Sequence, residues 1–406
     1  MINILDMINS NNIINFKEEA NKIKEQLINI RRDIHMHPEV GFEEVRTSNL
    51  IKSFLESEGI EYRSVATTGV CGIIKGTKEG PIKTIALRAD MDALPIQDKK
   101  TCEYSSKIPG RMHACGHDAH TTILLGAAKI LNDNKHLFSG NIKLLFEPAE
   151  ETTGGASVMI EEGVLENPKV SKVIGLHVAE DVEYGKIKIK KGVVNAASNP
   201  YKIKITGSGG HGASPSATID PIVIGANVVS TLQTIVSREI SAVNPAVVTV
   251  GTFHGGTAQN IIPESVEISG IIRTMTPEDR AFACKRVCEI SEGIAMTGRG
   301  KAEVAIEESY PCLINNDECV DLVKNAAISV LGAENVLEQK APSMGVESFA
   351  YFAMERDSAF YFLGTANVEK GTNKSAHSSL FDIDEDAIPL GVAIQCQSAF
   401  NYLTME

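Results

Sequence analysis

The segment RMHACGHDAH, residues 111–120, places a thiol and an imidazole two positions apart. Cys115 and His117 flank Gly116, and thiolate and imidazole are both good ligands for zinc and similar metals. The glycine allows the chain to bend so that both side chains point at one place. The segment also fits an ordinary helix start, in which Asp118 caps the helix and the histidines are incidental.

Two adjacent acids, Glu150 and Glu151, follow an apolar run in the segment LLFEPAEETTGG. Enzymes of the α/β class usually place their active-site groups at the carboxyl ends of strands, where these acids would lie. Adjacent carboxylates can take different roles, one on a metal and one beside it. Considered alone, however, the pair is better explained as a charge pair on a solvated loop.

Two more histidines lie where apolar runs or small residues give way to turns. His177 ends the apolar run VIGLH, and His377 lies in the small-residue loop of NKSAHSSLFDIDEDA. Considered one at a time, each is more typical of a structural histidine than of a ligand. Nothing further supports His113 or His120 as ligands, and we expect them in an outer layer around the site or on the surface.

Together these side chains supply enough donors for two metal ions with shared ligands. A two-metal site lowers the pKa of a bridging water and polarises a carbonyl group. A carboxylate beside the metals can then act as the general base. Glu150 suits that role because its neighbour Glu151 can take a ligand position. The expected metal ligands are Cys115, His117, Glu151, His177 and His377.

The run TGSGGHGASP formally contains the dinucleotide-binding pattern at Gly207, Gly209 and Gly212. We reject that interpretation because the run lies in an antiparallel-type region and no helix begins directly after it. No acid ends a suitable next strand either. The sequence instead favours His211 as a hydrogen-bond donor on a glycine-rich loop.

Two polar residues further along the same region are candidates for holding a substrate. Asn260 lies in TAQNIIP and Arg273 lies in SGIIRT. Arginine binds carboxylates through two parallel hydrogen bonds. The alternatives are ordinary loop polarity for Asn260 and a surface strand charge for Arg273.

Short apolar runs alternate with helical patterns, which predicts a layered α/β fold around these residues. Apolar spacing predicts helices over about 15–35, 47–58 and 121–131. Buried strands are expected at 71–75, 84–87, 141–146, 173–177 and 360–363.

The pattern changes near Gly192, where YKIKIT begins a strand with period-two alternation. A helix at 221–237, strands at 246–253 and 265–274, a helix at 277–296 and a strand at 302–307 follow. That order matches a ferredoxin-like α+β domain, inserted at 193–307. The larger domain, 1–192 and 308–406, is expected to be a metal-binding α/β domain with a central mixed sheet flanked by helices.

Length and composition limit the partners and the compartment. With 406 residues two domains are expected, and a formal net charge of −13 without a long basic run argues against nucleic acid. We expect no membrane span, and no signal peptide in the Asn-rich MINILDMINSNNIINF. Eight scattered cysteines predict reduced thiols in the cytoplasm.

Several motifs together resemble the co-catalytic metallopeptidases of the aminoacylase and carboxypeptidase type. Within that family the chain is most similar to bacterial amidohydrolases, hippurate hydrolases and plant auxin-conjugate hydrolases. The resemblance spans nearly the whole chain and keeps the family's order. It rests on HMHPEVGFEE, RADMDALP, MHACGHDAH, FEPAEE, GLH, GGHGASP, QNIIP and AHSSLFDIDEDA.

The resemblance implies a hydrolase of N-acyl-amino acids with two divalent ions per subunit, zinc or manganese first and cobalt or nickel next. It assigns the five ligands named above, with Cys115 bridging both ions, and Glu150 as base. It also implies a homodimer formed through the inserted domain, which acts as a lid, with His211 reaching the partner subunit's active site. Asn260 and Arg273 match substrate-binding positions.

Two positions depart from the wider family. RADMDALP has Asp90 where relatives carry a ligand histidine, so Asp92 is expected to orient a ligand from behind and a metal role for Asp90 is disfavoured. In MGVESF, Ser348 stands where relatives carry Asp while Glu347 is retained, which suggests a change in substrate preference or loop stability. A carboxypeptidase or dipeptidase with the same site, or a metal-binding protein without activity, are the alternatives.

Overall fold

The computed structural model describes residues 14–405 except 153, and these form two compact units. The first unit is built from described parts of Met1–Lys191, Asn315–Gln339 and Phe352–Glu406. The second contains Gly192–Ile314 and Lys340–Tyr351, so the predicted insert at 193–307 lies inside it. Each unit has a hydrophobic core of its own.

The first unit is organised around an eight-stranded mixed sheet with the order β1-β2-β4-β3-β5-β16-β6-β15. Its four central strands, β4, β3, β5 and β16, are mutually parallel, while β2 and β6 pair with them in the antiparallel sense. The strands are β1 (Glu61–Val65), β2 (Gly69–Lys75), β3 (Thr84–Asp90), β4 (Asn141–Glu147), β5 (Lys172–Glu183), β6 (Ile187–Ile189), β15 (Val336–Glu338) and β16 (Asp357–Ala366).

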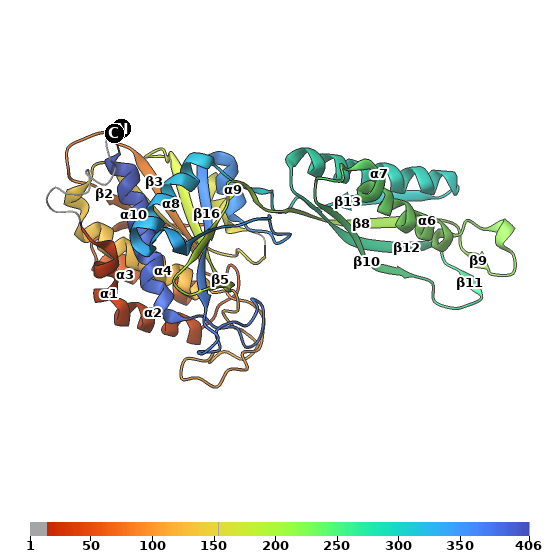
Figure 1. The fold of residues 1–406 in the computed structure, drawn as a ribbon. Helices are drawn as coiled ribbons and strands as arrows, with labels where there is room; N and C mark the ends of the chain where they lie inside the picture. The colour runs from red at the N-terminus through yellow and green to blue at the C-terminus, as the bar shows by residue number, and fades with distance from the viewer. Residues whose placement is uncertain (1–13, 153, 406) are drawn as a thin grey trace. The chain divides into compact units, whose positions relative to one another are not determined.

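Helices flank this sheet, which confirms the predicted mixed α/β architecture. α4, α8 and α10 pack on its strands, and α10 also packs on α4 and on α8 (Figure 1). The parallel central strands are buried on both faces and therefore read as continuous apolar runs. The helices are α1 (Phe16–Lys22), α2 (Lys24–Met36), α3 (Val45–Ser57), α4 (His117–Asp133), α5 (Gly155–Glu161), α8 (Asp317–Leu331), α9 (Phe349–Glu355) and α10 (Ile388–Thr404).

The single helix predicted for 15–35 is wrong in one respect, because the chain leaves helical geometry at Ile23. This residue has φ −104° and ψ 9°, and it separates α1 from α2. The apolar spacing does not indicate this break, because the Ile23 side chain still packs against the core. A hydrophobic stripe therefore continues across a break in backbone hydrogen bonding.

The second unit contains a four-stranded antiparallel sheet with the order β10-β12-β8-β13. Along the chain its elements alternate as strand, helix, strand, strand, helix, strand, which is the ferredoxin-like arrangement. The elements are β8 (Ala197–Thr206), α6 (Pro221–Thr234), β10 (Ala246–Gly255), β12 (Ser265–Thr274), α7 (Pro277–Thr297) and β13 (Lys301–Ile306). Two short pairs, β9 (Gly210–His211) with β11 (Ile261–Ile262) and β7 (Gly192–Asn195) with β14 (Leu313–Asn315), complete it.

Three further expectations concern a signal peptide, membrane spans and the cysteines. Most of the Asn-rich N-terminus, where no signal peptide is expected, falls in residues 1–13 and lies outside the described residues. Among the described helices, none combines the length and apolar character that crossing a bilayer requires. All eight cysteines carry free thiols.

Candidate metal centre

The predicted ligands lie at the carboxyl edge of the central parallel strands. β3 ends at Asp90, and β4 ends just before the loop that carries Glu150 and Glu151. His117 is the first residue of α4. His177, predicted to end its strand, lies inside β5, which continues to Glu183. It still reaches the edge because the pairing of β3 with β5 stops at Gly175.

The side chains of the five predicted ligands meet at this edge. Cys115 Sγ lies 3.3 Å from His177 Nε2, and His377 Nε2 lies 3.3 Å from Glu151 Oε1. His117 Nε2 lies 3.9 Å from the same Glu151 oxygen. Three sets have donor atoms within 4.8 Å of one another: Cys115 with His117 and His177, Cys115 with Glu151 and His377, and His117 with Glu150 and Glu151.

These residues fit a pair of divalent cations on grounds internal to the structure. Within the described part of the chain, His117 Nε2 and Glu151 Oε1 are buried and make no hydrogen bond, and His377 approaches the Glu151 oxygen only as an ion-pair contact at 3.3 Å. Burying polar atoms without partners costs free energy, and a cation between them would recover it. Thiolate, imidazole and carboxylate are also the donor set that zinc-like ions take.

Cys115 is a neutral thiol in this environment unless a cation is bound. Burial raises its pKa well above the ordinary value, and the charge of Glu151 raises it further. A bound divalent cation would reverse that preference, because metal binding to cysteine releases the thiol proton. Burial lowers the pKa of His117, but the charge of Asp90 and the hydrogen bond with Asp92 raise it well above the ordinary value, so a cation on His117 would displace a proton there as well.

Asp92 organises the site from behind. Its Oδ1 lies 3.2 Å from His117 Nδ1 and accepts the backbone N–H of Glu150 at 3.0 Å. Its Oδ2 accepts the backbone N–H of Glu151, also at 3.0 Å. The proton on His117 Nδ1 is directed at Asp92, so His117 Nε2 faces the other predicted ligands. His177 is oriented likewise, since its Nδ1 lies 2.6 Å from the carbonyl oxygen of Val178.

Asp90, His117 and His120 form a further set of close donors, but the contacts of His120 argue against a cation there. Its Nδ1 lies 2.6 Å from Asp90 Oδ1, and its Nε2 accepts the backbone N–H of Val178 at 2.9 Å. Both ring nitrogens are therefore engaged, and Asp90 is also paired with Arg88 at 2.6 Å.

The surface alternative for His113 and His120 is wrong, because both side chains are buried. Burial lowers the pKa of His120 to about 4 and that of His113 to about 3. Both are therefore neutral at physiological pH. The alternative in which Asp118 caps its helix is also wrong, since α4 already begins at His117 and Gly116 occupies the capping position.

The backbone around His377 is constrained on both sides. His377 itself has φ +64°, a left-handed conformation that non-glycine residues rarely adopt. Its N–H donates to the carbonyl of Ala114 at 2.7 Å, and the N–H of Ala376 donates to Glu180 Oε1 at 2.9 Å. Strained backbone of this kind persists where surrounding contacts fix it.

Sequence reasoning missed Glu180 and also Glu44, which supports the loop of the paired acids. Glu44 Oε1 accepts the N–H of Ala149 at 2.8 Å, and Ala149 has φ +57°. Glu44 Oε2 accepts the hydroxyl of Thr68 at 2.6 Å. The motif HMHPEVGFEE contains Glu44, but no neighbouring residue indicates which loop the Glu44 carboxylate contacts.

The remaining predicted residues belong to the second unit. His211 lies exposed on β9, pairs with Ile261 of β11, and its Nδ1 accepts the N–H of Ala213 at 3.0 Å. Asn260 precedes β11, is exposed, and accepts the N–H of Gly212 on its carbonyl at 2.8 Å. These contacts bring His211 and Asn260 onto neighbouring segments.

Arg273 and Ser348 are more enclosed. Arg273 lies in β12 between Ser198 and Val247, and its Nη1 is buried without a hydrogen-bond partner among the described residues. Burial lowers the pKa of Arg273. Ser348 is fully buried, and the adjacent Glu347 accepts the N–H of Phe349 at 3.0 Å.

Comparison with known proteins shows several relatives of the chain. The family model described as peptidase family M20/M25/M40 matches residues 86–401. IAA-amino acid hydrolase ILR1-like 4 of Arabidopsis thaliana is 42% identical over 390 residues, 95% of this chain and 87% of that protein. N-acetyl-L-cysteine deacetylase of Bacillus subtilis (strain 168) is 41% identical over 384 residues, 93% of this chain and 89% of that protein.

A peptidase and a solved structure are similar over the same span. Thermostable carboxypeptidase 2 of Saccharolobus solfataricus is 39% identical over 391 residues, 95% of this chain and 98% of that protein. The crystal structure of a Bacillus subtilis protein, described as a dinuclear metal-binding peptidase, has a TM-score of 0.81 and 34% identity. That match covers 94% of this chain and 99% of the other.

Proposed function

The chain belongs to peptidase family M20/M25/M40, and from that premise we propose that it is a two-metal amidohydrolase of N-acyl amino acids. Hydrolysis of an amide bond is what the family membership establishes. Beyond family membership, we propose that the substrate is an N-acyl amino acid. Two similar proteins, the IAA-amino acid hydrolase and the N-acetyl-L-cysteine deacetylase, have names that describe an amino-acid conjugate and an N-acetyl amino acid.

One observation supports the proposal most strongly. Two buried atoms without hydrogen-bond partners in the described chain, His117 Nε2 and Glu151 Oε1, lie 3.9 Å apart among the other predicted ligands. We assign Cys115, His117, Glu151, His177 and His377 as the residues that hold the ions. When bound, two divalent cations lower the pKa of a shared water and polarise a substrate carbonyl. Zinc or manganese is expected first, with cobalt or nickel as alternatives.

Glu150 is assigned the proton transfers. Its carboxylate has a donor atom within 4.8 Å of those of His117 and Glu151, and Asp92 fixes its backbone N–H. In the proposed reaction Glu150 takes a proton from the attacking water. It then delivers that proton to the nitrogen of the leaving amine, so the products are a carboxylate and a free amino acid.

The second unit is assigned to substrate stabilisation. His211, supplied by the partner subunit of a homodimer, would donate to the oxygen that becomes negative in the transition state. Arg273 or Asn260 would bind the carboxylate of the amino acid, a role for which a guanidinium is well shaped. A reducing compartment such as the cytoplasm is consistent with eight free thiols.

The decisive experiment compares Glu150→Gln with the wild type. The variant should keep two ions per chain and lose activity by a factor on the order of 10²–10⁴, the usual contribution of general acid–base catalysis. Full activity in Glu150→Gln would refute the assignment of the base. Failure of the wild type to bind two ions would refute the metal centre and, with it, the catalytic proposal.

A carboxypeptidase is the second candidate, favoured by the 39% identity to the thermostable carboxypeptidase. The bond broken is of the same kind, so the site chemistry does not separate the two. Apo protein reloaded with each metal should be assayed on acetyl- and benzoyl-amino acids and on dipeptides. Higher kcat/KM on the N-acyl substrates supports the amidohydrolase, and preference for dipeptides supports the peptidase. Two bound ions without turnover of any substrate would indicate a metal-binding protein instead.

A further inference from the structure

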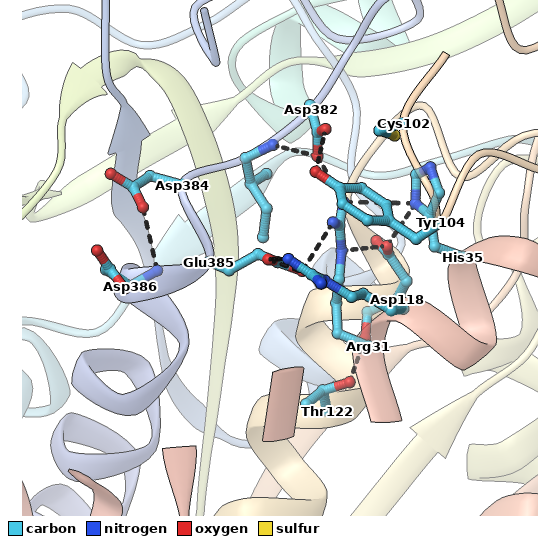
Figure 2. Close-up of polar contacts among 12 residues, drawn as sticks. Arg31, His35, Cys102, Tyr104, Asp118, Thr122, Asp382, Asp384, Glu385 and Asp386 are labelled. Carbon is cyan, nitrogen blue, oxygen red and sulfur yellow. Dashed lines mark hydrogen bonds and ion pairs between the residues drawn. The ribbon is translucent and has the colours of Figure 1, made fainter. Parts of the chain in front are cut away.

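Arg31 of α2 is a fully buried arginine that joins three carboxylates (Figure 2). Its Nε donates to Asp118 Oδ2 at 2.7 Å, and its Nη2 donates to Asp382 Oδ1 at 2.8 Å. Its Nη1 donates to Glu385 Oε1 at 3.2 Å. Every nitrogen of the guanidinium thus faces an acid.

The three acids belong to two segments that carry predicted metal ligands. Asp118 follows His117 directly, in the first turn of α4. Asp382 and Glu385 lie in the segment that follows His377. Arg31 therefore connects the helix that presents one ligand to the loop that presents another, although its own hydrogen bonds go to neither ligand.

Other side chains hold the same two segments (Figure 2). His35, also on α2, lies with Nδ1 2.7 Å from Asp118 Oδ2. The Tyr104 hydroxyl donates to Asp382 Oδ2 at 2.8 Å, and the Tyr104 ring lies 5.0 Å from the Arg31 guanidinium carbon. Lys100 donates to the carbonyl of Phe381 at 2.7 Å. The loop after His377 therefore accepts hydrogen bonds from α2 and from the segment that contains Lys100 and Tyr104.

Arginine is required here by geometry as well as by charge. The three acids lie at three different nitrogens of the Arg31 guanidinium, one at Nε, one at Nη1 and one at Nη2. A buried ion pair is weak evidence for stability, because desolvation offsets most of the attraction. Its fixed geometry is the better explanation, since a planar guanidinium can bind three acids at once and an ammonium cannot match those directions.

We propose that Arg31 is a positioning residue for the metal centre, holding the His377 loop at a fixed distance from the start of α4. This inference rests on the proposed function, because it concerns the spacing of His117 and His377 as ligands. Arg31 does not contact the substrate or the reacting atoms. Its effect is expected on the affinity for the ions and on kcat, with KM little changed.

The test is Arg31→Lys, which keeps the charge and loses the planar donor array. Co²⁺ added to apo protein should bind at least one site roughly 10–100-fold more weakly than in the wild type, as changes behind ligands usually do. The absorption band of the cobalt–thiolate bond should weaken at the same Co²⁺ concentration. The matched control is Arg356→Lys, since Arg356 is also mostly buried, donates to the carbonyl of Val170 at 2.8 Å and pairs with Glu166.

Asp382→Asn provides a second variant if Arg31→Lys does not fold. It removes one of the three carboxylate charges that pair with the Arg31 guanidinium, and it should weaken Co²⁺ binding by a smaller factor than Arg31→Lys. Wild-type affinity and an unchanged cobalt spectrum in either folded variant would overturn the inference. An equal loss in Arg356→Lys would show a general effect of destabilisation and would overturn it as well. A wild type that binds fewer than two ions would instead refute the proposed function.

Discussion

Asp92 Oδ1 lies 3.2 Å from His117 Nδ1, and the same side chain receives the backbone N–H groups of both paired acids. The Asp92 carboxylate therefore links the start of α4 to the loop after β4. It also determines which nitrogen of His117 faces the predicted ions, because the proton on Nδ1 is directed at Asp92. The spacing of ligand and base consequently depends on a residue that offers no atom to the ligand cluster itself.

Asp92→Asn should reduce metal affinity or kcat by about 10–100-fold. The amide keeps one acceptor oxygen, but its NH₂ group would face an N–H that now donates to a carboxylate oxygen. Co²⁺ titration of apo protein and steady-state kinetics would measure the two effects separately. The control is Asp181→Asn, because Asp181 is exposed and pairs only with Lys188 at 2.8 Å among the recorded ion pairs of the described chain. Equal behaviour of the two variants would contradict the role of Asp92.

Gly116→Ala should disrupt the segment between Cys115 and His117. Gly116 has φ +89°, and an added Cβ would lie 2.3 Å from Val178 Cγ2. The left-handed backbone alone costs about 1–2 kcal/mol for a residue with a Cβ. The steric overlap adds to that cost, and the two flanking ligands must shift to relieve it. We expect a lower Tm and fewer bound ions by metal analysis.

Gly110→Ala separates the two causes. Gly110 also has positive φ, at +74°, but nothing lies within 4 Å of an added Cβ. This control should show a modest fall in Tm with two ions retained. Gly116→Ala protein that holds two ions at wild-type affinity would show that the turn does not set the ligand geometry.

The sheet and the ligand cluster were largely predictable because their signals are local. Parallel central strands appear as apolar runs, and parallel strands bring their carboxyl ends to one edge. That rule alone brings Glu151 and His177 together from segments far apart in the sequence. The glycine between Cys115 and His117 likewise indicated a bend, and the structure has a left-handed residue there.

The supporting contacts were not predictable, since they join segments that no local pattern relates. Arg31 and Asp118 are 87 positions apart, and Ala376 and Glu180 are 196 apart. Whether His120 lies in the outer layer of the site or on the surface was left open for the same reason, because its contacts Asp90 and Val178 come from distant parts of the chain. Amphipathic spacing also continued through Ile23, where the backbone hydrogen bonding changes.

Asp98 gives a prediction for stability at acid pH. It accepts backbone N–H groups from Lys100 and Ser106 at 2.9 Å each, and His35 lies 3.7 Å away. Burial raises the pKa of Asp98, but the nearby His35 and these backbone N–H groups bring it down to about 2. A depressed carboxyl pKa stabilises the folded state above the unfolded pKa of about 4, and this contribution is lost as pH falls towards the folded value.

Asp98→Asn should therefore lower the free energy of unfolding by about 2 kcal/mol near pH 7. The difference from the wild type should begin to shrink below about pH 4 and be roughly halved near pH 3. Urea unfolding at pH 7, 5, 4 and 3 would measure this. A difference that stays constant down to pH 3, or grows there, would contradict the assignment of the shift to Asp98.

His211 provides the test of a shared active site. Its Nδ1 accepts the N–H of Ala213, so in the neutral ring Nε2 carries the proton and can donate. His211→Ala should lower kcat by about 10²–10³, the usual cost of one oxyanion donor.

If that donor comes from the partner subunit, His211→Ala and Glu150→Gln chains assembled together should recover activity that neither has alone. In a mixed dimer one site has both an intact Glu150 and an intact His211, so random pairing restores about a quarter of the wild-type activity. Replacing the Glu150→Gln chain by one that carries both changes removes every complete site and should abolish the recovery. Mixed dimers as inactive as their parents would place both residues in the same subunit.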